Sequence, residues 1–157
     1  MSNSRSLKQW LDAYGESHRH PTNKLIHWIC VPLIAYSLIA LSTLVPTFLP
    51  AEYLLFTNLG HLLVAAAFIF YWRLSPPMAL AMLLFGLLCL WLASWAKLSP
   101  VPLWESALSI FIAAWLGQFY GHKLEGKKPS FFEDLQFLMI GPAWLMADLF
   151  RKMDWKY

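Results

Sequence analysis

The sequence predicts an all-α integral membrane protein, a bundle of four transmembrane helices with an amphipathic helix before it and a further apolar segment after it. Composition is the first reason, because 59% of the 157 residues are hydrophobic, 17% are aromatic and only 13% are charged. With a mean hydropathy of +0.50, a water-soluble domain would expose large apolar surfaces. The second reason is the presence of four apolar stretches, each near the roughly 20 residues that cross about 30 Å of hydrocarbon. The third is that prolines separate these stretches.

The expected elements follow one another in a single membrane domain over residues 1–157. An amphipathic segment covers residues 1–24, and the spans cover about 25–49, 53–72, 78–96 and 103–120. Three short turns separate the spans, and they contain Pro46 and Pro50, then Ser75-Pro76-Pro77, then Ser99-Pro100-Val101-Pro102. Short turns imply antiparallel neighbours, so the four spans are expected to form one bundle.

The last apolar segment, residues 135–150, differs from the four spans. It is shorter, and Gly141-Pro142 interrupts it. Proline removes a backbone donor and favours a kink in a helix. This segment is therefore interpreted as a re-entrant or interfacial helix, with a fifth span as the alternative.

The distribution of the twelve Lys and Arg residues predicts the orientation, because basic residues near span ends stay on the cytoplasmic side. Lys97 is alone on one side. The other side carries Arg5, Lys8, Arg19, Lys24, Arg73, Lys123, Lys127, Lys128, Arg151, Lys152 and Lys156. Both termini are therefore expected in the cytoplasm. The net charge of +3 fits this topology and attraction to anionic lipid. The sequence contains no basic helix with interleaved aromatic residues, so it does not indicate a nucleic-acid partner.

Histidines supply the chemistry of this chain. The five are His18, His20, His27, His61 and His122. Asn23 and His27 are four residues apart at the start of the first span, so on a helix they share a face. His18 approaches from the preceding segment, which allows two or three imidazoles to converge.

A second polar group closes the fourth span. Gln118, His122 and Glu125 follow one another at the spacing of one helix face. The His122 and Glu125 pair has the spacing by which bundle helices offer two metal ligands, or a ligand and its orienting partner. Four spans that start inside bring the end of the fourth back to the side where the first began. His27 and His122 are therefore expected at the same depth.

Each of these residues also has a plainer explanation. A histidine near a membrane boundary is often only an amphipathic anchor. His20 adjoins Pro21 and is two residues from His18, so on a continuous helix the two would face different ways. His61 lies deeper in its span, where an ionisable residue is a functional candidate but can equally bond a neighbouring helix.

The two polar segments together resemble a known family. The run Tyr14-x3-His18-x2-Pro21-x-Asn23-x3-His27-x4-Pro32 is followed far downstream by Gln118-x2-Gly121-His122-x2-Glu125-Gly126-Lys127-x-Pro129. This pattern is similar to that of the yeast-type membrane 2-hydroxy fatty acid dioxygenases, and the resemblance covers essentially the whole chain. It implies an iron(II)-dependent enzyme of fatty acid α-oxidation, which uses O₂ to shorten a long-chain 2-hydroxy acid by one carbon.

The resemblance also implies roles for single residues. His18, His27 and His122 carry over as catalytic iron ligands. Apart from the resemblance, Glu125, His20 and His61 are further ligand candidates. The candidate substrate-binding residues are Asn23, Gln118, Lys123, Lys127 and Arg19. The implied partners are the 2-hydroxy acid, O₂ and membrane lipids, and an oligomer is compatible with the sequence. The membrane would be a bacterial inner membrane or the endoplasmic reticulum, with the histidine cluster on its cytoplasmic side.

Two alternatives remain open at the level of the sequence. One is a b-haem or quinone-linked electron-transfer protein, in which two of His27, His61 and His122 clamp a haem between helices. The other is a non-enzymatic lipid-binding or scaffold protein, in which the histidines anchor and join helices.

Overall fold

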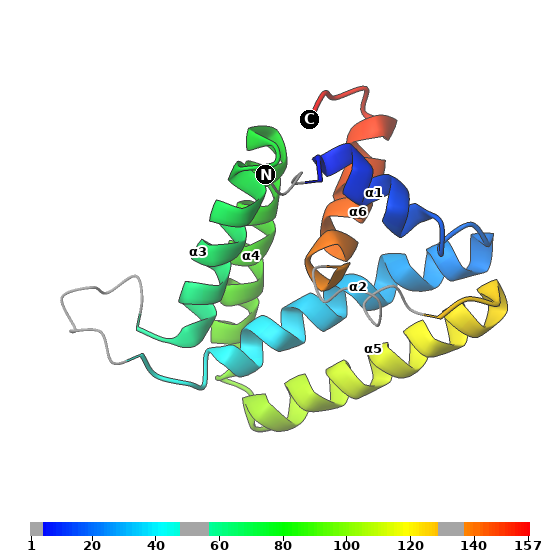
Figure 1. Ribbon diagram of the computed structural model, residues 1–157. Helices are drawn as coiled ribbons and strands as arrows, with labels where there is room; N and C mark the ends of the chain where they lie inside the picture. The colour runs from blue at the N-terminus through cyan, green and yellow to red at the C-terminus, as the bar shows by residue number, and fades with distance from the viewer. Residues whose placement is uncertain (1–4, 48–56, 129–136) are drawn as a thin grey trace.

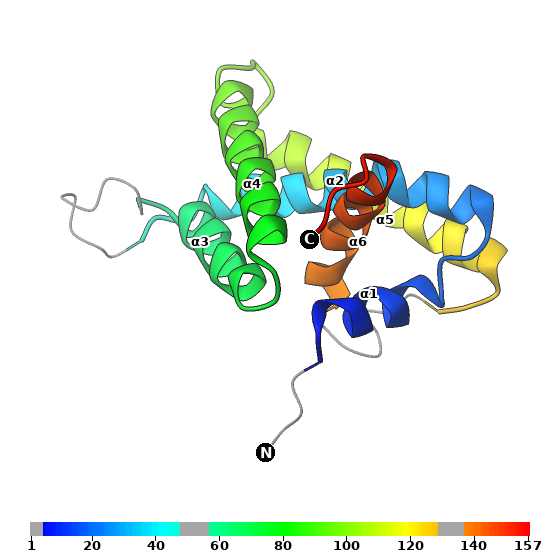
Figure 2. The same cartoon turned by 90° about the horizontal axis from the view of Figure 1, so that it is seen from above.

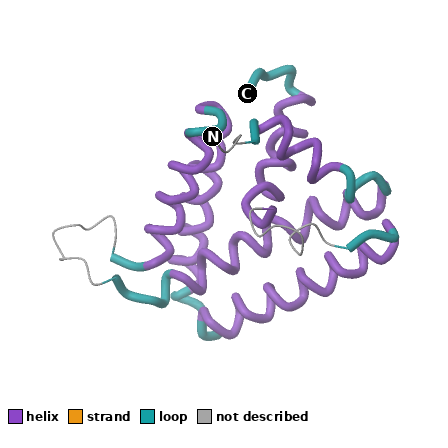
Figure 3. Tube along the Cα trace, in the orientation of Figure 1, coloured by secondary structure: helices purple, strands orange, loops and turns teal. Residues whose placement is uncertain are grey.

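The computed structural model describes residues 5–47, 57–128 and 137–157, and over these residues it holds helices and no strand (Figures 1 and 3). The helices are α1 (Leu7–Gly15), α2 (Pro21–Ser42), α3 (Leu59–Trp72), α4 (Pro76–Ala96), α5 (Leu103–Glu125) and α6 (Phe137–Lys152). The all-helical class predicted from the sequence is confirmed.

Local sequence signals start and end the helices that later form the site. The side-chain oxygen of Ser6 accepts from the backbone N–H of Gln9, which caps α1. Pro21 occupies the first turn of α2, where its missing N–H costs nothing, and the His20 side chain caps the same helix. Gly126 ends α5 in the left-handed region, with φ of 72°.

The long helices lie in two crossed pairs. α2 and α5 run antiparallel along their lengths, and the hairpin of α3 and α4 stands steeply across them (Figures 1 and 2). The expected single bundle of sequential neighbours is therefore wrong in one respect, since α5 pairs with α2 instead of returning along α4. The reason is close packing, because Gly117 of α5 faces Cys30 of α2. If Gly117 were alanine, its methyl group would lie only 2.7 Å from Sγ of Cys30, too close for the present helix spacing. Small residues allow two helix backbones to approach in this way.

Two helices, α2 with 22 residues and α4 with 21, are long and apolar enough to cross a membrane. α3 is apolar but has only 14 residues, and residues 53–56 of the predicted second span lie outside the described part of the chain. α5 has 23 residues but does not reach the apolarity of the other two. Four crossings thus stay a prediction, while α2 and α4 support association with a membrane.

The outer faces of the long helices carry large apolar side chains. Leu25 of α2, Leu84 of α4 and Leu116 of α5 are 64%, 68% and 65% exposed. Exposure of this kind suits contact with lipid better than contact with water.

α6 lies against α1 and over α2 and α4 (Figure 1). It is one helix from Phe137 to Lys152 and continues through Pro142. Phe137 packs edge-on against Trp10 of α1, with ring centroids 5.4 Å apart, and Ile140 and Ala143 are fully buried. The segment predicted as re-entrant, interfacial or a fifth span is thus largely buried against the rest of the protein. Together α1 and α6 cover the half of α2 that carries His27.

A candidate metal centre beside an apolar cavity

Three histidines from three parts of the chain meet in the interior. His27 lies in the second turn of α2, His122 in the last turns of α5, and His18 in the loop between α1 and α2. One ring nitrogen of each lies within 4.8 Å of those of the other two. The three side chains are only 0%, 3% and 1% exposed. The pairing of His27 with His122 that the topology predicted is present in the structure.

The hydrogen bonds of the imidazoles leave nitrogens free for a ligand. The Nδ1–H of His18 donates to the carbonyl of Tyr14 at 2.6 Å, and the Nδ1–H of His27 donates to the carbonyl of Asn23 at 2.9 Å. Because a carbonyl only accepts, these bonds place the proton on Nδ1 and the lone pair on Nε2. Both Nε2 atoms, and Nδ1 of His122, are buried without a partner within the described residues. A metal ion is the ligand such a donor set fits, and metal-binding histidines characteristically donate their other N–H to a carbonyl.

The imidazole of His18 is uncharged at neutral pH. Burial, followed by the neighbouring His27, lowers the pKa of His18 to about 3. Uncharged imidazole is the form that binds metal, so this residue needs no deprotonation at neutral pH.

Glu125 holds the loop that carries His18. Its Oε1 accepts from the backbone N–H of Arg19 at 2.9 Å, and its Oε2 accepts from the backbone N–H of His20 at 2.8 Å and the Asn23 amide at 3.1 Å. Burial acts to raise the pKa of this carboxyl, but the three donors outweigh it and hold the pKa below the usual value. Lys127 fixes the same loop, because its Nζ donates to the carbonyl of Glu16 at 2.9 Å.

Glu125 therefore joins the end of α5 to the start of α2 and, in this structure, stands outside the metal-binding group. The predicted ligand candidates His20 and His61 are also not brought to it. The exposed His20 caps α2 by accepting from the backbone N–H of Thr22. His61 lies in the first turn of α3, next to Gly60, which faces Thr43 just after the opposite end of α2.

The predicted substrate-binding residues lie in different surroundings, some buried near the histidines and others exposed. Gln118 is buried beside the His27 imidazole and lines a cavity. Asn23 is fully buried and bonds the Ser17 carbonyl as well as Glu125. Lys127 bonds the loop, and Arg19 and Lys123 are exposed.

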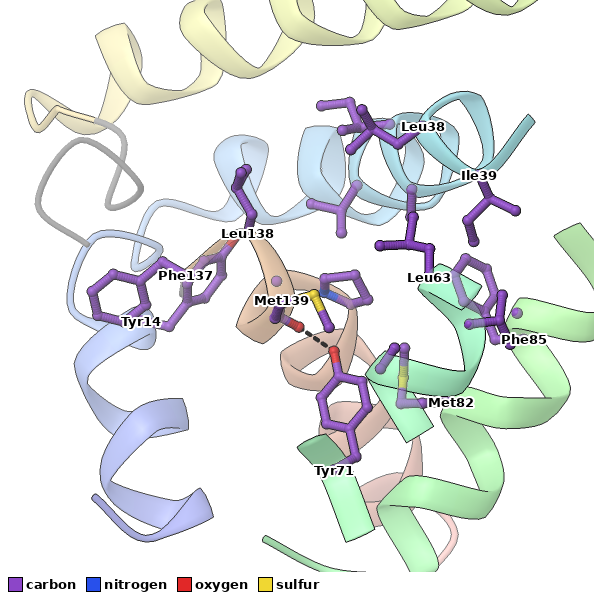
Figure 4. Close-up of a pocket in the computed structure, with 18 of the residues that line it drawn as sticks. Tyr14, Leu38, Ile39, Leu63, Tyr71, Met82, Phe85, Phe137, Leu138 and Met139 are labelled. Carbon is purple, nitrogen blue, oxygen red and sulfur yellow. Dashed lines mark hydrogen bonds between the residues drawn. The ribbon is translucent and has the colours of Figure 1, made fainter. Parts of the chain in front are cut away.

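An apolar cavity of about 370 Å³ adjoins the histidines. His122, Gln118 and Tyr14 are among its lining residues. Apolar side chains of α2, α3, α4 and α6 line it as well, Leu38 and Phe85 among them (Figure 4). The volume lies within the range of about 300–1,000 Å³ that is usual for small-molecule sites. Sequence reasoning missed the cavity, and it gave no role to Tyr14. The Tyr14 ring stacks on His18 with centroids 4.1 Å apart. Their four-residue spacing at the end of α1 is the signal that was available.

Fold and site together define a helical protein with a buried three-histidine group, one member of which, His122, lines an apolar cavity. The chain matches the family model described as 2-hydroxy-palmitic acid dioxygenase Mpo1-like over residues 4–153, and it belongs to this family. The family indicated by the sequence resemblance is therefore confirmed. No curated protein and no solved structure matches the chain.

Proposed function

We propose that this protein is an iron(II)-dependent membrane dioxygenase that shortens long-chain 2-hydroxy fatty acids by one carbon with O₂. One observation carries the proposal: three buried imidazoles present unpartnered nitrogens to one another, and His122 of this group also lines a largely apolar cavity. Membership of a family described by a 2-hydroxy-palmitic acid dioxygenase supports the same chemistry.

Iron(II) is the metal that the donor set and the chemistry favour together. Imidazole suits several transition metals, and non-haem iron sites that activate O₂ keep open positions beside a few protein ligands. When bound, iron(II) supplies the redox chemistry with O₂ that amino-acid side chains lack. His18, His27 and His122 would hold it, while the carbonyls of Tyr14 and Asn23 orient the first two rings.

The cavity suggests how the substrate lies. Its polar lining at Gln118 and His122 suits the hydroxy acid head, and the apolar lining between α2, α3 and α4 suits the acyl chain. The acyl chain of the substrate moves from the apolar bilayer into an apolar cavity, so its burial gains little free energy. Discrimination among lipids must therefore come from the head group and from the length of the cavity. The exposed Arg19 and Lys123 follow His18 and His122 in the sequence, so they lie at the same end of the molecule as the histidines. Their charges fit an anionic, cytoplasmic membrane surface. A bacterial inner membrane or the endoplasmic reticulum would provide it.

The test is metal content and turnover of the full chain, purified anaerobically in detergent. We expect about one iron per wild-type chain and none in His27→Ala or His122→Ala, since three imidazole ligands are needed to retain the ion. With 2-hydroxyhexadecanoic acid and O₂, the wild type should yield the acid with one carbon fewer, and both variants should yield none.

Other outcomes would support the alternatives. Stoichiometric haem with a Soret band would favour electron transfer. Folded wild-type protein that takes up no metal would favour the non-enzymatic lipid-binding or scaffold function. Iron without O₂-dependent product would overturn the proposed reaction while leaving the metal centre in place.

A further inference from the structure

Two tyrosines line the cavity, and their hydroxyls have different surroundings. Tyr71 is 1% exposed, and its hydroxyl donates to the backbone carbonyl of Met139 (Figure 4). Tyr14 is 6% exposed and lines the cavity, and within the described residues its carbonyl, not its hydroxyl, makes the hydrogen bonds. The hydroxyl oxygen is not among the fully buried polar atoms that lack a partner. It therefore stays accessible at the cavity, where a ligand can accept a hydrogen bond from it.

The structure fixes the place of the Tyr14 ring on several sides. It stacks on His18 with an interplanar angle of 11°, and it packs against Phe137 and Trp144 with centroids 6.0 and 5.6 Å away. The hydroxyl reaches α6 at Gly141, where a methyl group would lie 3.0 Å from the oxygen. The absence of a side chain at Gly141 thus leaves room around the hydroxyl.

The position of Tyr14 relates it to the metal centre as well as to the cavity. Its carbonyl accepts from Nδ1 of His18, its ring covers the same imidazole, and it shares the cavity wall with His122 and Gln118. A hydrogen bond from its hydroxyl would therefore fix a ligand whose polar end lies beside the histidines.

We propose that Tyr14 is a substrate-recognition residue, whose hydroxyl donates a hydrogen bond to an oxygen of the hydroxy acid head. The inference rests on the proposed function for the class of ligand. A neutral phenol donates to a carboxylate oxygen or to a hydroxyl oxygen, and both are present at the head of a 2-hydroxy acid.

The experiment compares Tyr14→Phe with Tyr120→Phe in the full chain. Tyr14→Phe keeps the ring on His18 and removes only the hydroxyl, and Tyr120→Phe makes the same change to a side chain of α5 that is 59% exposed and does not line the cavity. Binding of 2-hydroxyhexadecanoic acid and of hexadecanoic acid is measured anaerobically, together with metal content and thermal stability. Gly141→Ala, which crowds the hydroxyl from α6, provides a second variant.

We expect Tyr14→Phe to keep its metal and to bind 2-hydroxyhexadecanoic acid about tenfold more weakly, the effect of one lost hydrogen bond. Tyr120→Phe should stay within about twofold of the wild type, and Gly141→Ala should weaken binding as Tyr14→Phe does. Equal weakening for both acids would assign the bond to the carboxylate, and weakening for the hydroxy acid alone would assign it to the 2-hydroxyl.

Unchanged affinity in Tyr14→Phe, or equal losses in Tyr14→Phe and Tyr120→Phe, would overturn the assignment. So would a wild type that binds neither acid. If Tyr14→Phe does not fold, Gly141→Ala decides the question by the same comparison. Binding is measured without turnover, so it tests the role of Tyr14 separately from the reaction. If the two tyrosine variants differ as expected but the wild type forms no product, the proposed reaction is overturned and the role of Tyr14 stands.

Discussion

His27 of α2 and His122 of α5 face each other with ring centroids 4.9 Å apart and ring planes at 89°. Antiparallel pairing brings the start of one helix level with the end of the other, which places these two imidazoles together. His18 completes the group from a loop, with centroids 4.2 and 4.9 Å from those of His27 and His122. Two helices and one held loop therefore make the candidate metal centre.

The first prediction concerns the two histidines of that loop. His18→Ala removes a buried imidazole of the group, and we expect iron affinity to fall by at least about 100-fold, more than the loss of an outer-shell partner causes. His20→Ala changes an exposed helix cap two residues away and should keep the iron. Metal titration of both variants checks this. Retained iron in His18→Ala would remove that residue from the ligand set.

The second prediction concerns Glu125. Glu125→Gln replaces a carboxylate that accepts three N–H bonds. We expect a loss of about 1–3 kcal/mol in stability, because hydrogen bonds to charged groups are the stronger ones. Iron affinity should fall about tenfold as the loop loosens, the range for outer-shell partners. Glu105→Gln, an exposed change in the first turn of α5, is the matched control for thermal denaturation and metal titration. Complete loss of iron from a folded Glu125→Gln protein would instead indicate that Glu125 is a direct ligand.

The third prediction tests the close approach of α5 to α2. A methyl group on Gly121 would lie 2.3 Å from Oδ1 of Asn23, a fully buried side chain already bonded to Glu125. We expect Gly121→Ala to cost about 1–3 kcal/mol, as overpacking usually does, and to weaken iron binding. Gly126→Ala meets open space and strains only the backbone, so its cost should be about 1 kcal/mol.

Thermal unfolding and metal titration of the two glycine variants provide the comparison. The Gly126→Ala protein should keep its iron, because that residue only ends α5. Equal stability of Gly121→Ala and the wild type would show that the Asn23 side chain can move aside.

The fourth prediction concerns chain length. Ala35 of α2 lines the cavity, and Ala35→Phe should shorten the space for an acyl chain. We expect turnover of a 16-carbon 2-hydroxy acid to fall about tenfold relative to a 12-carbon one, with metal content unchanged. Leu33→Phe, on the exposed face of the same helix, is the control. An unchanged length preference in Ala35→Phe would place the acyl chain elsewhere.

Local patterns predicted much of this arrangement. Apolar stretches and turn prolines located α4 and α5 well, whereas α2 ends at Ser42, before the predicted end at residue 49. The spacing of His122 to the polar residues around it identified one half of the site. The order of the helices predicted that His27 and His122 lie together, since the start of one antiparallel helix lies level with the end of the other. These features depend on residues near one another in the chain or on the order of helices.

The sequence could not predict which helices touch. The short turn after α4 favoured α4 and α5 as neighbours, but Gly117 and Gly121 let α5 approach α2 more closely than larger residues would. Glu125 was predicted as a possible ligand because carboxylates bind iron. In the fold its oxygens accept from the loop instead, and backbone N–H groups have no signature in a sequence.

By itself the sequence determined the helical class, because composition and apolar stretches express it locally. The resemblance of its two polar segments to a known family indicated the family and the three histidines. Only the tertiary structure decided that α2 and α5 pair across the molecule, that Glu125 and Lys127 hold the loop carrying His18, and that the Tyr14 hydroxyl borders an apolar cavity. Such contacts join residues far apart in the chain. They depend on side-chain volume and on the direction of single hydrogen bonds, which are fixed when the helices pack.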